Sequence, residues 1–248
     1  MNIEVIPVIG IPEVKSGDDL GVLITGALGR QGVRLENGDI VVVKQKVVSK
    51  AEGRVVELET VSPSPKARAL ARKERKDPRL VELILRESVR VVRAGHGVII
   101  TETRQGFVCA NSGVDQSNVG KGNASLLPVN ADMSAKRLRR HLESKTKKKV
   151  AVIVSDTFGR PWRRGQTDVA IGCSGIQPLM PYAGKTDKFG YALRVTEPSI
   201  ADEAAGAAEL AMGKLSAICA AIVRGVCFIR GDVGTKSMII PRDRDLFR

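Results

Sequence analysis

The spacing of apolar and polar positions predicts short strands that alternate with amphipathic helices. Residues 3–8 are typical of a short strand, and the continuous β-branched run at 39–44 is typical of a buried one. Residues 97–101 and 107–110 are expected to pair through a turn that contains Gly106. Further strands are expected at residues 150–154, 168–173 and 219–223, the first of them ending at Ser155 and Asp156.

Capping residues mark the expected helices. Asp18 or Asp19 can open a helix whose leucines recur at helical spacing, and Asp77 can cap a second helix with Pro78 in its first turn. Ser199 can cap a third helix, in which Asp202 and Glu203 complement the helix dipole and which ends at Gly213. Residues 134–143 predict a short basic helix, and residues 46–54 are expected to form a loop. The pattern as a whole predicts a mixed α/β (α+β) architecture.

The composition is that of a folded, soluble protein. With 248 residues, 43% of them apolar, the chain can bury a full core as one large domain or as two intertwined lobes. The first residues lack the basic start and the apolar segment of a signal peptide. The most apolar late stretch, residues 215–229, is interrupted by Arg224 and Gly225. We therefore expect a cytoplasmic protein that does not bind membranes.

The cysteines and histidines do not form a zinc-binding motif. The four cysteines are widely spaced in apolar surroundings, and the only histidines are His96 and His141. Reduced, buried thiols are expected instead. A bound metal would need mostly oxygen ligands, which favours Mg²⁺ or Mn²⁺.

The excess of basic residues suits an anionic partner. Forty Lys and Arg against 27 Asp and Glu give a net charge of +13, which fits nucleic acid, a nucleotide or a phosphorylated metabolite. The basic runs at residues 66–76 and 136–149 are typical of solvated helix faces and a loop. One Trp, two Tyr and five Phe form no aromatic cluster for stacking bases, so nucleic-acid binding is an alternative without a positive motif.

Two polar segments that follow predicted strands carry the candidate chemistry. The chain has no P-loop, no dinucleotide-binding glycine motif and no nucleophile elbow. Asp115 and Asp156 each follow a predicted strand, where carboxylates can share one or two hard cations, and Thr157 can add a neutral oxygen. Candidate phosphate contacts are Asn118, Arg160, Arg163 and Arg164.

Each of these residues also has an ordinary structural interpretation. Asp115 and Asn118 can shape a turn, and Asp156 with Thr157 can cap a helix. Composition and spacing alone therefore indicate a soluble α/β protein and a candidate phosphate-handling enzyme.

Several segments in order along the chain resemble the coenzyme F420-0:L-glutamate ligase family, the γ-glutamyl ligases of deazaflavin biosynthesis. They lie at residues 7–20, 47–54, 111–128, 150–172 and 201–225, and the longest reads VAVIVSDTFGRPWRRGQTDVAIG. The resemblance implies a GTP-dependent ligase with three anionic substrates. The terminal carboxylate of coenzyme F420-0 would take the γ-phosphoryl group of GTP, and the amine of L-glutamate would then attack the acyl phosphate to form an amide.

The resemblance also implies roles for individual residues. Asp115 and Asp156 would be catalytic and would bind Mg²⁺ or Mn²⁺, with Thr157 at a second ion and K⁺ as a further candidate cation. Lys214 departs from the family pattern, because some members carry an acidic or amide residue there and a protonated lysine cannot ligate a cation. The implied GTP contacts are Ile11, Pro12, Glu13, Val14, Gln45, Lys46, Lys50, Asn118, Met212, Gly213, Lys214, Leu215, Ser216, Ala217, Ile218 and Cys219.

The resemblance further implies an intertwined homodimer with a family-specific fold of mixed sheets. Residues 1–248 are expected to form a single γ-glutamyl ligase module, without the fused nitroreductase-like domain of some relatives. A ligase of the same chemistry acting on another carboxylate, such as a folate, is an alternative. A further alternative is a non-catalytic basic module that binds nucleic acid. This alternative does not explain the two segments that contain Asp115 and Asp156.

Overall fold

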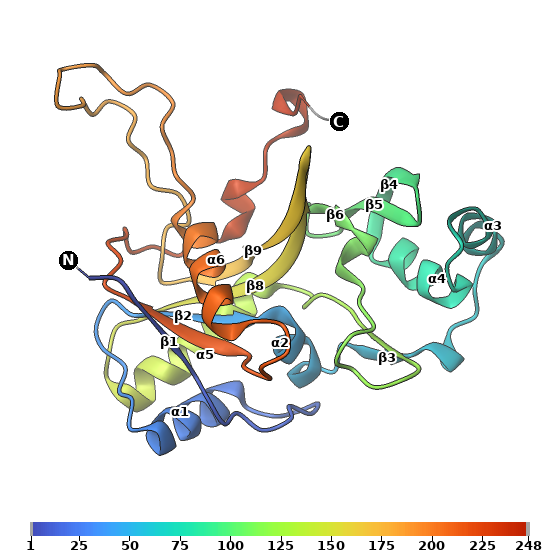
Figure 1. The fold of residues 1–248 in the computed structure, drawn as a ribbon, viewed down its shortest axis with the longest axis horizontal. Coiled ribbons are helices and arrows are strands. Elements are labelled where there is room, and N and C mark those ends of the chain that lie inside the picture. Colours follow the sequence, from blue (N-terminus) through green and yellow to red (C-terminus); the bar gives the residue numbers. More distant parts are fainter. Residues whose placement is uncertain (1, 247–248) are drawn as a thin grey trace.

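A five-stranded sheet forms the centre of the computed structural model, which describes residues 2–246 (Figure 1). Strands β2 and β8 run parallel, and every other neighbouring pair in this sheet is antiparallel. In spatial order the strands are β1 (Glu4–Pro7), β10 (Ala220–Arg224), β2 (Ile40–Lys44), β8 (Ala151–Arg160) and β9 (Arg163–Ser174). The expected mixed α/β fold and the strands predicted at residues 3–8, 39–44 and 219–223 are confirmed.

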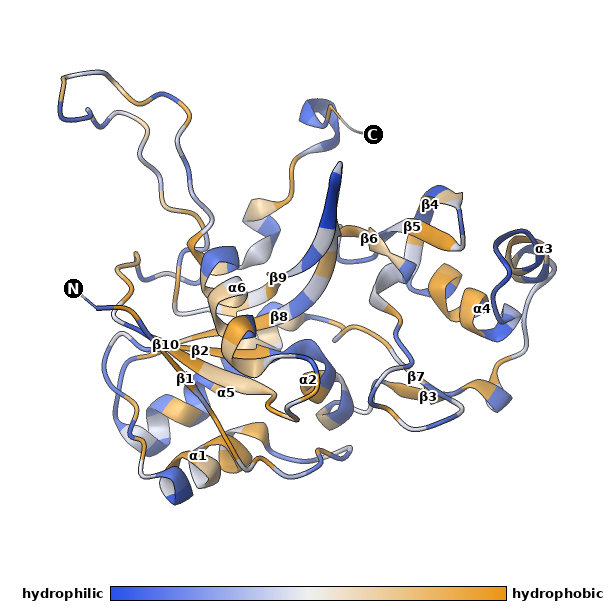
Figure 2. Cartoon of the chain, in the orientation of Figure 1, coloured by the Kyte–Doolittle hydropathy of each residue, from blue (hydrophilic) through white to orange (hydrophobic). Residues whose placement is uncertain are grey.

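Helices cover both faces of this sheet. Helices α1 (Leu20–Gln31) and α5 (Ala131–Thr146) pack on one face, and α6 (Ile200–Met212) packs on the other. Alternate residues of β2 enter the two cores, Val41 on the α1–α5 side and Val42 on the α6 side. Burial on both faces explains why this strand is a continuous β-branched run, and the central strands are correspondingly apolar in Figure 2.

The predicted helix caps are present in the structure. Asp19 Oδ1 accepts hydrogen bonds from the backbone N–H groups of Gly21 (2.8 Å) and Val22 (3.1 Å) at the start of α1. Asp77 and Ser199 cap their helices in the same way. The basic helix α5 is longer than predicted, because the side chain of Asn130 caps it upstream of residue 134.

A smaller group of elements with its own apolar core lies beside the main sheet (Figure 1). Strands β5 (Val98–Thr103) and β6 (Val108–Ala110) pair as predicted, but the partner of β5 on its other side, β4 (Ser88–Gly95), was not predicted. The remaining elements here are α3 (Pro65–Glu74), α4 (Pro78–Arg86), and the paired strands β3 (Val55–Glu57) and β7 (Asn123–Ser125). Short 3-10 turns are η1 (Leu58–Thr60), η2 (Asn111–Gly113), η3 (Thr235–Met238) and η4 (Arg242–Arg244).

The prediction of a loop at residues 46–54 is wrong, because residues Gln45–Ala51 form helix α2. Gln45, Val48 and Ser49 lie on its buried face at helical spacing. Ser49 Oγ also contacts Gln45 Oε1 (2.9 Å) and donates to the carbonyl oxygen of Leu126 (2.6 Å). These tertiary contacts outweigh the local preference of two adjacent valines for an extended backbone.

The strand expected to end at Ser155 and Asp156 continues to Arg160, so the prediction that Asp156 follows a strand is wrong. Strands β8 and β9 form one long hairpin in which Asp156 pairs with Val169 and Thr157 with Asp168. The outer part of this hairpin is hydrophilic and stands clear of the sheet (Figure 2). The segment between β9 and α6 also extends away from the body (Figure 1). Within residues 2–246, every helix is too short or too polar to traverse a bilayer.

Candidate functional site

A cavity of about 400 Å³ opens where the β8–β9 hairpin meets the loop after β6. The start of α2 and the segment after α6 complete its wall. Acidic, basic and amide side chains from these separate parts of the chain face it together. Its polar wall residues include Lys44, Gln45, Lys46, Asn111, Asp115, Ser117, Asn118, Ser155, Asp156, Thr157, Gln166, Asp168 and Lys214.

Asp156 lies in the middle of β8, held by strand pairing on a rigid element. Its deep position in the cavity raises the pKa of its carboxyl group to about 7, and the nearby negative charges of Asp168 and Asp115 act in the same direction. The backbone N–H of Thr157 and the charge of Lys46 oppose this rise. The interpretation of Asp156 and Thr157 as a helix cap is wrong, since both are strand residues.

Asp115 is presented by a strained turn. Asn111, Ser112 and Gly113 have left-handed φ values of 55°, 52° and 69°. The buried Ser112 hydroxyl holds this turn through contacts with the Thr101 hydroxyl (2.8 Å) and the Ile84 carbonyl (3.0 Å). Asp115 itself forms an isolated bridge with Ser125, so its position is fixed on both sides.

The carboxylate of Asp115 is paired with Lys46 at the start of α2. The Lys46 ammonium also donates to the carbonyl oxygen of Ser117 (2.8 Å), and the Ser117 hydroxyl donates to Asp115 (2.6 Å). Burial on its own would raise the pKa of Asp115, but these hydrogen bonds outweigh it and leave the pKa below its ordinary value. Asp115 is therefore held as an anion beside Asp156.

A third aspartate, Asp168, was not predicted as a site residue. It is 2% exposed and lies opposite Thr157 in the hairpin. Its carboxylate accepts hydrogen bonds from the hydroxyl groups of Thr157 (2.6 Å) and Ser155 (3.2 Å). The sequence signal was an acidic residue at the edge of an apolar strand, but only the hairpin register shows that it faces the cavity.

Lys44 was also missed. It is the last residue of β2, and its ammonium donates to the carbonyl oxygen of Gly213. Burial lowers the pKa of Lys44, and the nearby charge of Lys214 lowers it further. Together with Lys46 and Lys214 it makes the cavity wall strongly basic on the sides that face the aspartates.

A second cavity, of about 480 Å³, is lined by three of the residues that the resemblance implies as GTP contacts. Glu13, Val14 and Lys50 line it, and Lys50 forms an ion pair with Glu13. Lys46 and Lys50 lie one turn apart on the same side of α2, so this helix forms a wall of both cavities. Helix α2 thus contributes one lysine to the wall of each cavity.

The other expected contact residues are not all brought to these cavities. Met212 is fully buried in the core beneath α6, Ile11 packs against the opposite core, and Leu215 is 99% exposed. Arg160 is turned toward the backbone of the hairpin tip. Twelve of the expected contact residues do not line either of these two cavities: Ile11, Pro12, Arg160, Arg163, Arg164, Met212, Gly213, Leu215, Ser216, Ala217, Ile218 and Cys219.

Asp115 and Asp156, which line the same cavity, are the carboxylates that could hold one hard divalent cation. The charge of Asp115 raises the cost of ionising Asp156, which a cation would relieve, and Asp115 itself is already paired with the Lys46 ammonium. No cluster of three His, Cys, Asp or Glu residues suited to a metal occurs within residues 2–246. The remaining oxygens would have to come from water and substrate, as is usual for Mg²⁺.

The hydroxyl of Thr157 does not fit a second ion in this arrangement. It donates to Asp168 (2.6 Å) and accepts a hydrogen bond from Lys214 Nζ (2.7 Å). A cation there would meet the lysine ammonium at contact distance. This contact agrees with the departure from the family pattern at Lys214, since a protonated lysine cannot ligate a second ion.

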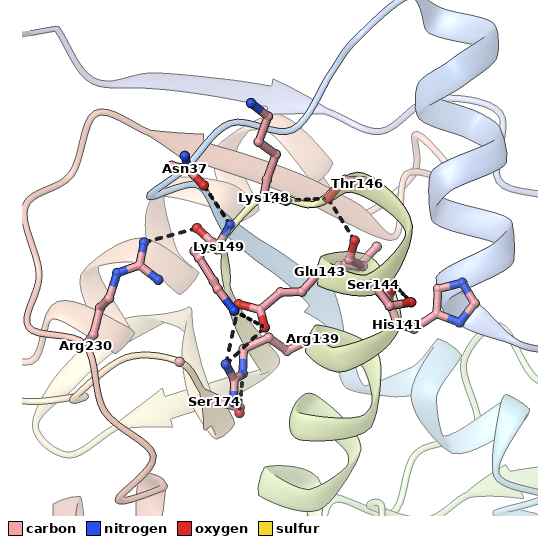
Figure 3. A network of polar contacts seen from close by, with 12 residues as sticks. Asn37, Arg139, His141, Glu143, Ser144, Thr146, Lys148, Lys149, Ser174 and Arg230 are labelled. Carbon is pink, nitrogen blue, oxygen red and sulfur yellow. Dashed lines mark hydrogen bonds and ion pairs between the residues drawn. The ribbon is translucent and has the colours of Figure 1, made fainter.

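The basic run at residues 136–149 is partly neutralised within the protein (Figure 3). Arg139 and Lys149 both approach Glu143, and Arg139 also donates to the Ser174 hydroxyl (2.9 Å). Arg230 donates to the backbone carbonyl of Lys149 (3.1 Å). These basic side chains fix the end of α5 against the sheet, which gives the run a structural purpose.

Comparison with known proteins gives one consistent result. Residues 8–225 match the model of the family described as F420-0:Gamma-glutamyl ligase. A protein of Methanothermobacter thermautotrophicus is 45% identical over all of both chains. Proteins of Methanocaldococcus jannaschii (45% identical over 86% of each chain) and Methanopyrus kandleri (42% identical, covering 95% of this chain and 94% of the relative) are similar too. All three relatives are named Coenzyme F420:L-glutamate ligase. The chain belongs to the F420-0:gamma-glutamyl ligase family.

Proposed function

We propose that this chain is a GTP-dependent ligase that joins L-glutamate to the deazaflavin precursor coenzyme F420-0. The observation that carries the proposal is one cavity in which Asp115 and Asp156 face Lys44, Lys46 and Lys214. Phosphoryl transfer depends on positioning and charge compensation more than on a protein nucleophile, and this cavity offers both signs of charge. Family membership supplies the acceptor and the amino acid.

The nucleotide is proposed to occupy both cavities, each of which is lined by a lysine of α2. The cavity with Glu13 and Lys50 offers a carboxylate for the donor groups of a guanine base. The lysines of the larger cavity would contact the phosphate oxygens as point charges, next to Asp115 and Asp156. Asn118 and Gln45 add neutral donors to that wall.

The reaction that we propose proceeds in two steps. A carboxylate oxygen of the acceptor attacks the γ-phosphorus of GTP, the bond to the β-phosphate oxygen breaks, and GDP leaves. The ammonium group of glutamate loses one proton, and its nitrogen attacks the acyl carbon. The bond from this carbon to the phosphate-bearing oxygen then breaks, inorganic phosphate leaves with the former carboxylate oxygen, and the nitrogen loses its second proton to give the amide. Asp115 and Asp156 would hold Mg²⁺ or Mn²⁺, which when bound neutralises phosphate charge. Lys44 and Lys46 would stabilise the negative charge that develops on the transferred group.

The active assembly is proposed to be a homodimer. The segment between β9 and α6 exposes Phe189 (83%), Tyr191 (69%) and Val195 (91%), although side chains of this kind are usually covered. A second copy of the chain would cover them.

The deciding experiment incubates the purified protein with GTP, Mn²⁺ or Mg²⁺, L-glutamate and coenzyme F420-0. Mass spectrometry should show increments of one glutamyl unit, and ATP and folate in parallel reactions test the nucleotide and the acceptor. An acceptor labelled with ¹⁸O in its carboxylate should transfer one label to the released phosphate. Failure to form any glutamyl product beside an active control enzyme would refute the proposed function, and product without label transfer would refute the acyl phosphate alone.

A further inference from the structure

Lys214 occupies an unusually acidic position for a side chain at the edge of a cavity. Its ammonium lies 3.1 Å from Asp168 Oδ1, 3.1 Å from Glu209 Oε1 and 2.7 Å from the Thr157 hydroxyl. Three oxygen atoms from β8, β9 and α6 thus surround one nitrogen. This is the arrangement that oxygen ligands make around a cation, with a protein-borne ammonium at its centre.

The oxygens of Asp168 and Thr157 around Lys214 already have hydrogen-bond partners within the protein. Asp168 is almost completely buried, and its two oxygens accept hydrogen bonds from Ser155, Thr157 and Lys214. The Thr157 hydroxyl uses its proton toward Asp168 and a lone pair toward Lys214. A divalent ion could reach these oxygens only by displacing the lysine.

Removing Lys214 would leave this pocket with excess negative charge. Within residues 2–246, Lys214 forms ion pairs with Asp168 and Glu209, and the carboxylate of Asp168 is 2% exposed. An uncompensated buried carboxylate is costly, so another cation should be drawn in when the ammonium is lost. The carboxylates of Asp168 and Glu209 thus require a neighbouring positive charge, and the Lys214 ammonium provides it.

We propose that the Lys214 ammonium serves as a fixed cation in place of a second divalent ion, so that this chain binds one divalent ion per active site. This inference rests on the proposed function, because it assumes that Asp115 and Asp156 hold the first ion. The ammonium reaches the cavity wall, where its positive charge would attract the phosphate groups of the nucleotide without giving up its three oxygen partners.

The proposal is tested by counting bound ions. The protein is dialysed to equilibrium against Mn²⁺ and GDP, and the excess manganese per chain is measured for the wild type and for Lys214→Gln, Lys214→Arg and Lys66→Gln. The wild type should bind one ion. Lys214→Gln, which removes the charge and adds a neutral ligand oxygen, should bind two. Lys214→Arg keeps the charge, and Lys66→Gln removes an exposed lysine of α3, so both should bind one.

Electron paramagnetic resonance of the same samples gives a second readout. One isolated Mn²⁺ produces a six-line spectrum in the wild type, whereas two neighbouring ions in Lys214→Gln should couple and broaden it. Circular dichroism confirms that each variant is folded. Two ions in the wild type, or one ion in folded Lys214→Gln, would overturn the role of Lys214 while leaving the proposed function standing. If neither the wild type nor any variant binds an ion, there is no metal site at Asp115 and Asp156, and both the role of Lys214 and the proposed function are overturned.

Discussion

Replacing Asp156 with Asn should make the metal-free protein more stable at neutral and alkaline pH. Among residues 2–246 no ion pair is formed with Asp156, and burial with two neighbouring aspartates raises its pKa to about 7. An acid whose pKa is higher in the folded state than in the unfolded chain weakens folding once it must ionise. Asn fills a similar volume and never ionises, so it removes that cost.

The size of the effect follows from the two pKa values. The rise from the ordinary value of 3.8 to about 7 corresponds to roughly 4 kcal/mol, at about 1.4 kcal/mol for each pH unit. Below pH 3.8 the carboxyl group is protonated in both states and the cost is absent. The cost should grow between these pH values, because the unfolded chain then holds fewer protons, and it should be constant above about pH 7.

Urea denaturation in EDTA at pH 5, 6, 7 and 8 measures this directly. The free energy of unfolding of Asp156→Asn minus that of the wild type should increase with pH and level off above about 7. Asp243→Asn, which changes an exposed carboxylate outside the cavity wall, is the matched control. A difference that does not vary with pH would refute the reasoning. Added Mn²⁺ should reverse the order, since it stabilises only a protein that can bind it.

Three further outcomes are expected. Asp115→Asn should abolish glutamate addition, measured as glutamyl product by mass spectrometry, while the circular dichroism spectrum is unchanged; near-normal turnover would contradict the metal role of Asp115. Mn²⁺ affinity, measured by calorimetry, should rise by up to about tenfold per pH unit below about pH 7, because Asp156 must lose a proton to bind; a flat profile would contradict this. Light scattering should give the mass of a dimer, and Phe189→Ser with Val195→Ser should give a monomer, whereas a monomeric wild type would end the dimer proposal.

Local chemistry predicted the elements whose signals lie within a few residues. Asp19, Asp77 and Ser199 cap helices because each accepts from backbone N–H groups of its own first turn. The apolar run of β2 is buried on both faces, and its pattern shows this directly. Neither conclusion requires knowledge of the rest of the fold.

Other features depend on contacts that are distant in sequence. Helix α2 is specified by packing of Gln45 and Ser49 against residues near Leu126, which a local pattern does not contain. The extension of β8 through Asp156 comes from pairing with β9, whose outer residues are polar on both faces. For the same reason Asp168 was missed, since its place in the site follows from the register that sets it opposite Thr157.

The charges of the site are arranged as pairs that substrates can exchange. Lys46 is paired with Asp115, Lys50 with Glu13, and Lys214 with Asp168. On the proposed function, Lys46 would pass to a phosphate oxygen when a triphosphate binds, and a divalent ion would take its place beside Asp115. Lys214 would stay with Asp168, so that this buried carboxylate keeps its partner throughout. Asp156 is the exception, because it forms no ion pair within the described chain and its pKa is raised to about 7. A divalent ion therefore gains most beside Asp156 and least beside Thr157, where Lys214 already provides the charge.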